Sequence, residues 1–116
     1  MKQSHVLQLA CEPLPIVRIG FIGLGNRGMA TLRRYLVIDG VEIVALCDIH
    51  RAHLDEASAV IAADGKYTPC LLNAQDGWKQ MCQRDDIDLI YICTDWLTHA
   101  PMACYAMEQG KHVAIE

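Results

Sequence analysis

The sequence predicts an α/β fold, a doubly wound parallel sheet. Two observations predict it: apolar runs alternate with helical patterns from residue 16 onward, and the main apolar runs contain few polar residues. A strand that is apolar throughout is buried on both faces, as in a parallel sheet covered by helices. Right-handed crossovers between such strands then produce a doubly wound sheet.

The first half of the chain predicts two strands and two helices. Residues 16–22 form a short β-rich run, and residues 26–37 carry Met29, Leu32 and Leu36 at helical spacing. Residues 41–47 are a second apolar strand, and residues 51–63 are an Ala-rich helix. Together they predict two successive strand–helix units.

The second half is less regular. Residues 66–72 are a weaker strand, which Pro69 confines to a sheet edge because proline cannot donate to a central ladder. We expect a helix that begins at Thr98, tolerates Pro101 in its first turn and ends at Gly110. The other expected elements are a short helix at 76–83 with Trp78 and Met81 facing inward, a strand at 89–93 and a last strand at 112–115.

Length and charge set the class of protein. The 116 residues suit one domain, which we place at residues 16–116, after an N-terminal leader at residues 1–15. The net charge of −4 and the lack of a basic run argue against nucleic acid and anionic membranes as partners. No apolar stretch is long enough to span a bilayer, so no membrane is expected.

The six cysteines show no C-x-x-C spacing, and the histidines show no metal-ligand spacing with the acids. We therefore expect reduced thiols, a cytoplasmic location and no metal site. His50 and His53, followed by Asp55 and Glu56, are interpreted as a solvated helix face. No nucleophile–base arrangement emerges, so no catalytic residue is assigned.

A glycine-rich loop, G-L-G-N-R-G, follows the first strand and opens the first helix. In this arrangement Gly23 permits a tight turn, Gly25 lets the backbone approach a pyrophosphate, and Gly28 lets the helix pack against the strand. Helix N–H groups then bind the anion, and Asn26 and Arg27 lie at the loop tip. Taken alone, the pattern is also compatible with a simple glycine-rich turn.

An acid completes the pattern. Asp48 ends the second strand, 20 residues after Gly28, where a carboxylate accepts hydrogen bonds from the adenosine ribose. Alone, Asp48 is equally compatible with a helix cap. In register with the strand, loop and helix, it predicts a Rossmann dinucleotide site that prefers NAD to NADP, because the acid repels a 2′-phosphate. His50 and Arg51 nearby are the residues that would tolerate that phosphate.

A second polar cluster, Thr94 to His99, follows the strand at 89–93. Ligands of open parallel sheets bind beyond the carboxyl ends of strands, so this loop should face the glycine loop. Trp96 either offers a stacking face to a ligand or packs in the core. His99 is either a titratable ring near the start of the helix or an ordinary surface histidine. Glu116 ends the last strand at the same edge, or is a solvated terminal residue.

These motifs together resemble the N-terminal half of the Gfo/Idh/MocA oxidoreductase family. The resemblance covers residues 16–116 through VRIGFIGLGNRG, VEIVALCD, DDIDLIYICTDWLTH and AMEQGKHVAIE. It implies a Rossmann domain that binds NAD or NADP, followed in the family by a substrate domain for sugars or cyclitols. Thr94 and His99 match the family's Thr-Pro-x-x-x-His loop, whereas Asp95 replaces the proline. The family's catalytic lysine would follow Glu116 and has no position here.

One branch of the family is more similar still. The NAD-dependent glycosidases related to α-N-acetylgalactosaminidases share the Asn26-Arg27-Gly28 and Trp96-Leu97-Thr98-His99 segments. In that branch, NAD oxidises the sugar transiently and is regenerated, an exception to two-carboxylate hydrolysis. The predicted cofactor-binding residues are Gly23, Gly25, Asn26, Arg27, Gly28, Asp48, Thr94, Trp96, Leu97, Thr98, His99 and Glu116.

Three functions follow as expectations. The first is the NAD(P)-binding domain of a Gfo/Idh/MocA-type oxidoreductase that transfers hydride on a sugar or cyclitol. The alternatives are the same domain of an NAD-dependent glycosidase, and a non-catalytic NAD-sensing or oligomerisation module. The 116 residues alone are expected to be inactive, to need a C-terminal domain for a sugar-like substrate, and to form homo-oligomers through the apolar flank after Ile115.

Overall fold

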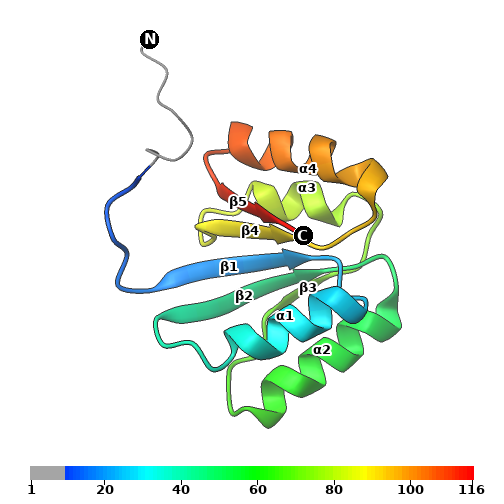
Figure 1. Cartoon of the computed structure of the whole chain (residues 1–116). Coiled ribbons are helices and arrows are strands. Elements are labelled where there is room, and N and C mark those ends of the chain that lie inside the picture. Colours follow the sequence, from blue (N-terminus) through cyan, green and yellow to red (C-terminus); the bar gives the residue numbers. More distant parts are fainter. Residues whose placement is uncertain (1–9) are drawn as a thin grey trace.

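The computed structural model describes residues 10–116 and contains one five-stranded parallel sheet with helices on both faces (Figure 1). The strand order is β3-β2-β1-β4-β5, and every neighbouring pair is parallel. This confirms the predicted doubly wound sheet. Of the predicted leader, residues 1–9 lie outside the described residues. No helix in residues 10–116 is long and apolar enough to cross a membrane.

The elements alternate along the chain as the sequence pattern predicts. Their bounds are β1 Val17–Ile22, α1 Asn26–Tyr35, β2 Val41–Cys47, α2 Arg51–Ala63, β3 Cys70–Leu72, α3 Gly77–Cys82, β4 Leu89–Ile92, α4 Trp96–Glu108 and β5 His112–Ile115. β3 is short and lies at the edge, where Pro69 precedes it. Gly110, with φ +82°, follows α4 as expected for a residue that ends a helix.

The two faces of the sheet are covered by different helix pairs. Alternate strand residues such as Phe21 and Leu46 pack against α1 and α2, whereas their neighbours Ile22 and Cys47 pack against α3 and α4. This alternation follows from the two-residue period of a strand. It explains why the central strands are apolar on nearly every residue.

The N-terminus of α4 departs from the sequence prediction. The helix begins at Trp96 rather than Thr98, because the Asp95 side chain accepts a hydrogen bond from the Thr98 N–H at 3.1 Å and caps the helix. Pro101 consequently lies in the second turn and not in the first.

The sheet has a topological switch point between the neighbouring strands β1 and β4. The chain builds β2 and β3 on one side of β1 and then crosses to build β4 and β5 on the other side. Loops that follow β1 and β4 therefore separate at the carboxyl ends of these strands, which is where ligands bind in open α/β sheets.

Candidate dinucleotide site

A hollow of about 350 Å³ opens at this switch point, and we call it the strand-end cleft. Five of the predicted site residues line it: Gly23, Gly25, Asp48, Thr94 and Thr98. They come from the ends of β1, β2 and β4 and from the first turn of α4. The tertiary structure therefore brings together residues up to 75 positions apart, counted from Gly23 to Thr98.

The three glycines of the loop have different surroundings. Gly23 has φ +92°, and a Cβ there would lie 2.6 Å from the carbonyl oxygen of Cys93. A Cβ at Gly28 would overlap the carbonyl oxygen of Gly23, so α1 packs directly on the loop backbone. A Cβ at Gly25, in contrast, would meet no atom within 4 Å. The fold itself requires Gly23 and Gly28, whereas the absence of a side chain at Gly25 leaves open space beside the loop.

The N-terminus of α1 is suited to an anion. Gly25 is its N-cap and provides no side-chain cap, and the first turn carries no acid. The first N–H groups of a helix have no intrahelical acceptor, and the helix dipole adds positive charge there. The N-terminus of α4 is different, because Asp95 caps it. Of these two helix ends at the strand-end cleft, α1 is the one whose donors remain available to a phosphate.

Asp48 is 8% exposed, and its carboxylate accepts three hydrogen bonds. Its Oδ2 accepts from the Leu24 N–H at 2.8 Å and lies 2.9 Å from His53 Nδ1, and its Oδ1 accepts from the His50 N–H at 2.8 Å. Burial by itself would raise the pKa of Asp48, but the hydrogen bonds from His50, Leu24 and His53 outweigh burial and lower the pKa. The carboxylate is thus held ionised and joins the glycine loop to the start of α2.

The predicted solvated helix face is confirmed for His50, Asp55 and Glu56, which are exposed, and is wrong for the ring of His53. The His53 side chain is 38% exposed, and its ring contacts the Asp48 carboxylate. His50 is exposed and lies against it, with ring centroids 5.0 Å apart. The helical period places residue 53 toward the end of β2, so the tertiary structure turns this ring inward while Arg51 and Asp55 form an exposed ion pair with each other.

Glu116 and Arg27 lie outside the strand-end cleft and bind each other. Arg27 Nη1 is 3.0 Å from Glu116 Oε1, and Glu116 Oε2 accepts hydrogen bonds from the hydroxyls of Tyr91 and Thr31. The hydrogen bond from Tyr91 lowers the pKa of Glu116. Glu116 is therefore not simply a solvated terminal residue, because it links β5 to the first turns of α1.

The segment from Thr94 to His99, which includes the first turn of α4, presents its side chains in two directions. Trp96 and Leu97 are 90% and 89% exposed, which shows that the core-packing alternative for Trp96 is wrong. His99 turns back, with Nε2 2.9 Å from the carbonyl oxygen of Thr94. The Thr94 and Thr98 hydroxyls lie 2.6 Å apart in the strand-end cleft. This segment thus combines the exposed apolar side chains of Trp96 and Leu97 with the two threonine hydroxyls that line the cleft.

Sequence reasoning missed the contribution of the segment after β3. Ala74, Gln75 and Trp78 line the strand-end cleft, and Asn73 Nδ2 donates to the carbonyl oxygens of Asp48 and Ile49. The rule that ligands bind at strand ends pointed to this segment too. β3 has only three residues, and such a short strand leaves a weak pattern in the sequence that does not locate its carboxyl end.

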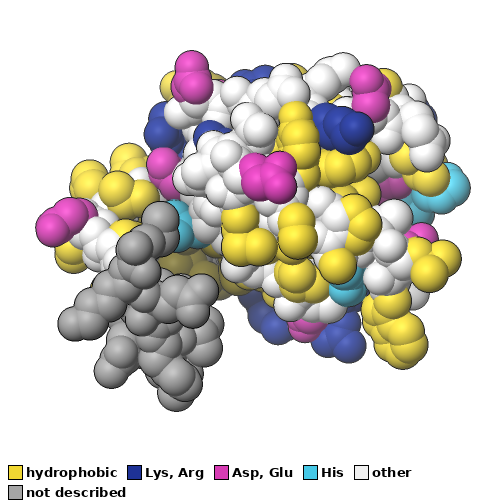
Figure 2. Space-filling view, turned by 90° about the horizontal axis from the view of Figure 1, so that it is seen from above, with side chains coloured by type: hydrophobic (Ala, Val, Ile, Leu, Met, Phe, Trp, Pro, Cys, Tyr) yellow, Lys and Arg dark blue, Asp and Glu magenta, His cyan; other side chains and the backbone are white. Residues whose placement is uncertain are grey.

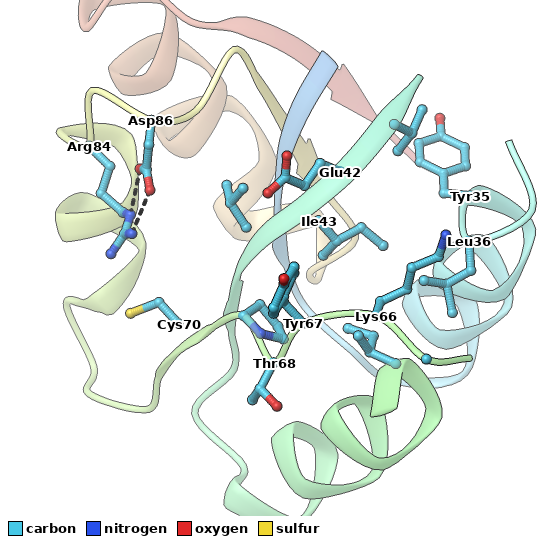
Figure 3. Close-up of a pocket in the computed structure, with 15 residues that line it drawn as sticks. Tyr35, Leu36, Glu42, Ile43, Lys66, Tyr67, Thr68, Cys70, Arg84 and Asp86 are labelled. Atoms are coloured by element: carbon cyan, nitrogen blue, oxygen red, sulfur yellow. Dashed lines mark hydrogen bonds and ion pairs between the residues drawn. The ribbon is translucent and has the colours of Figure 1, made fainter. Parts of the chain in front are cut away.

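A second hollow lies at the opposite end of the strands (Figure 3). This β2-edge cavity, of about 500 Å³, lies beside the first half of β2, between the ends of α1 and α2 and the segment after α3. Figure 3 shows Arg84 paired with Asp86, with Lys66 and Tyr67 on another wall. It contains no glycine loop and no helix N-terminus.

The face that carries α3 and α4 shows charged side chains of both signs, spread singly among uncharged ones (Figure 2). Among the described side chains, this face presents no extended charged patch. The features that point to a ligand are those of the strand-end cleft: the free N–H donors of α1, the open space at Gly25 and the hydrogen-bonded carboxylate of Asp48.

A family model described as an oxidoreductase family with an NAD-binding Rossmann fold (GFO_IDH_MocA) matches residues 17–116. The chain belongs to this family. The resemblance predicted from the glycine loop, Asp48 and the two later motifs is thereby confirmed, as are the Rossmann fold and NAD as the cofactor of the domain.

The Gfo/Idh/MocA relatives include glycosidases. The chain is 61% identical over 114 residues to a protein of Bacteroides fragilis named alpha-N-acetylgalactosaminidase, covering 98% of this chain and 27% of the relative. It is 47% identical over 116 residues to glycosyl hydrolase family 109 protein 2 of Phocaeicola vulgatus, covering 100% of this chain and 28% of that relative. The chain thus spans about a quarter of the length of these relatives.

Solved structures of the family are also similar. A scyllo-inositol dehydrogenase from Lactobacillus casei with bound NAD(H) and scyllo-inositol superposes with a TM-score of 0.72 at 25% identity, covering 86% of this chain and 27% of that one. The apo form of a scyllo-inositol dehydrogenase from the same organism gives 0.71 at 26% identity, covering 86% and 28%. The Rossmann architecture is therefore common to glycosidase and dehydrogenase relatives.

Proposed function

We propose that this chain is the cofactor domain of an NAD-dependent glycoside hydrolase that acts on α-linked N-acetylgalactosamine. The observation that carries the proposal is the 61% identity to the alpha-N-acetylgalactosaminidase of Bacteroides fragilis over nearly the whole chain. The geometry of the strand-end cleft supports the NAD-binding part of the proposal, and the similarity to a named glycosidase supports the reaction.

The residues of the cleft fit the dinucleotide. The pyrophosphate would lie over Gly25, where a Cβ would meet no protein atom, against the N–H groups of Asn26, Arg27 and Gly28 at the uncapped N-terminus of α1. Asp48 would accept a hydrogen bond from a ribose hydroxyl. Gly23 and Gly28 keep the loop close to β4 and α1, so they act on the cofactor through the shape of the backbone.

The second half of the dinucleotide would extend toward the Thr94–His99 loop. Thr94 and Thr98 supply hydroxyls, and the exposed Trp96 and Leu97 supply apolar surface that a bound ring or sugar would cover. His99 fixes the loop through the Thr94 carbonyl oxygen. Glu116 pairs with Arg27 beside the glycine loop, and both residues would then lie at the side of the bound cofactor.

NAD, when bound, supplies a reversible hydride acceptor. The part of this chain is to bind the dinucleotide, orient it through Asp48 and the glycine loop, and exclude water. These residues are assigned to cofactor binding and none is assigned a proton-transfer role, so we propose that catalytic acids and bases come from residues of the whole protein outside this chain. The 116 residues alone should therefore turn over no sugar.

Net oxidation of a sugar or cyclitol is the second candidate function. The similarity to inositol dehydrogenase structures favours it, and the expectation from the family as a whole was a hydride-transfer oxidoreductase. The two reactions differ in their products. A glycosidase releases the leaving group without net formation of NADH, whereas a dehydrogenase forms NADH in proportion to substrate consumed.

The first experiment is a fluorescence titration of the chain with NADH and NADPH. Trp78 lines the strand-end cleft and Trp96 stands at its side, so bound NADH should quench tryptophan emission. We expect saturable quenching by NADH, weaker quenching by NADPH, and loss of the NADH quenching on Asp48→Ala. A folded chain that binds neither nucleotide would contradict the proposed site. The whole protein, incubated with p-nitrophenyl α-N-acetylgalactosaminide, should then release nitrophenol without net NADH.

Self-association is also part of the proposal. β5 is an edge strand, and Ile115 at its end is 47% exposed, so a further strand or chain is expected to pack there. Light scattering should show a species larger than one chain as concentration rises. A monomer at high concentration would contradict it.

A further inference from the structure

We propose that His53 is a specificity-determining residue of the dinucleotide site: its imidazole fixes the Asp48 carboxylate so that the site accepts a ribose hydroxyl and discriminates against a 2′-phosphate. The inference rests on the proposed NAD site. It adds a residue that lies five positions beyond Asp48, outside the glycine loop and the strand-end acid.

The first step is the occupancy of the carboxylate. An ionised carboxylate has about four lone-pair positions, two on each oxygen. Asp48 Oδ2 accepts from the Leu24 N–H and from His53, at 2.8 Å and 2.9 Å, so both of its positions are filled. Oδ1 accepts only from the His50 N–H among the described residues. One acceptor position is therefore left, and it is on Oδ1.

The second step is the tautomer. Asp48 is ionised, because its hydrogen bonds lower its pKa, and an ionised carboxylate can only accept. His53 must therefore carry a proton on Nδ1, which donates to Oδ2. Nε2 has no hydrogen-bond partner among residues 10–116. His53 thus acts on the carboxylate through one ring nitrogen and keeps the other free.

The third step is the consequence for the ligand. Without the His53 donor, the carboxylate keeps only the Leu24 N–H on Oδ2 and the His50 N–H on Oδ1, so its position is held less firmly. A fixed Oδ1 offers one acceptor to a ribose hydroxyl, which strengthens NADH binding. NADPH gains little from this acceptor, because its 2′-phosphate is an anion that the carboxylate repels. His53 therefore raises the affinity for NADH more than the affinity for NADPH.

Two substitutions separate the donor from the ring. His53→Phe keeps a ring of similar shape and removes the nitrogen. His53→Asn removes the ring and keeps an N–H donor, because Asn Nδ2 and His Nδ1 are both joined to Cγ. Urea unfolding of each variant checks that it folds, and Asp48→Asn serves as the reference for loss of the acid.

The test is the ratio of the dissociation constants for NADPH and NADH in wild type and both variants. We expect His53→Phe to weaken NADH binding about tenfold, with a change of about twofold or less for NADPH, and His53→Asn to restore NADH binding to within about twofold of wild type. A loss of nucleotide affinity that is equal for NADH and NADPH, or equal in Phe and Asn variants, would overturn the proposal and leave the NAD site standing. Failure of the wild-type chain to bind NADH would instead remove the site itself.

A measurement on the wild-type chain keeps the inference testable if a variant does not fold. Imidazole ¹⁵N spectra report which ring nitrogen carries the proton. We expect the neutral form of His53 to be protonated on Nδ1, before and after NADH is added. A neutral form protonated on Nε2 would overturn the proposal, because Nδ1 then cannot donate to Asp48.

Discussion

The strand-end cleft and the β2-edge cavity lie at opposite ends of the same strands, and the larger of the two is not the candidate site. The cavity has about 500 Å³ and the cleft about 350 Å³. Only the cleft combines an uncapped helix N-terminus, a glycine with open space at its Cβ position and a buried acid. In the cavity, Arg84 is neutralised by Asp86 at 2.7 Å. Converging donors and charge, rather than volume, identify the binding site.

The largest expected effect concerns Gly28. A methyl group there overlaps the carbonyl oxygen of Gly23, which is backbone and cannot move aside without displacing the loop. Gly28→Ala should abolish NADH binding and lower the urea midpoint of unfolding, both measured on the same preparation. Normal stability together with normal binding would show that α1 does not pack against the loop as described.

Gly25→Ala sharpens the comparison, because it should weaken NADH binding and leave the stability of the fold unchanged. Its Cβ meets no atom within 4 Å in the protein, so the fold should tolerate it. The methyl group would occupy space assigned to the pyrophosphate, and we expect NADH affinity to fall by about a hundredfold or more. Calorimetric titration alongside thermal unfolding gives both quantities. Retained affinity would place the pyrophosphate elsewhere.

Asp48→Asn should have an intermediate effect on both properties. The amide keeps one acceptor oxygen but turns an NH₂ group toward donors that the carboxylate now accepts from, including the Leu24 or His50 N–H. We expect a loss of about 1–3 kcal/mol in the free energy of unfolding and a smaller preference for NADH over NADPH. Urea denaturation and the two dissociation constants check it. An unchanged preference would argue against Asp48 as the ribose acid.

Substitutions in the β2-edge cavity serve as the control, because they should not change NADH binding. Lys66 and Tyr67 line it, and Tyr67 is 94% exposed, so Lys66→Ala and Tyr67→Ala should leave the fold intact. Because the cavity is at the far end of the strands, we expect NADH affinity within about twofold of wild type. A large loss of NADH affinity in either variant would mean that the dinucleotide binds in the cavity.

The smallest effect is a pH dependence of stability that comes from thiols beneath the strand-end cleft. Burial raises the pKa of Cys47 to about 12 and of Cys93 to about 11. The pKa of a cysteine thiol in the unfolded chain is about 8.5. The folded state holds these protons more tightly, so their stabilisation is complete below that pH and is lost as pH rises toward 11–12. The urea midpoint should fall between about pH 8 and 10, and a smaller fall in Cys47→Ala would assign part of it to that thiol.

Much of the site could be predicted from local pattern. The helical period, the turn glycines and the strand-end acid are properties of short segments, so the sequence predicted β1, β2, the loop and Asp48 closely. His53 and the segment from Asn73 to Trp78 were missed for the opposite reason. The helical period shows which face of α2 packs on the sheet, but the contact between His53 and Asp48 also depends on how α2 is positioned against the end of β2, which no local pattern gives.

The sequence by itself determined the order of strands and helices and the glycine loop with its acid, because periodicity, glycine spacing and apolar runs act over a few residues. The tertiary structure decided which side chains share a hydrogen bond. It turned His53 onto Asp48, paired Arg27 with Glu116 across 89 positions, and placed Trp96 in solvent. Those contacts depend on the order of strands in the sheet and on the packing of helices against it, which join residues that no local pattern connects.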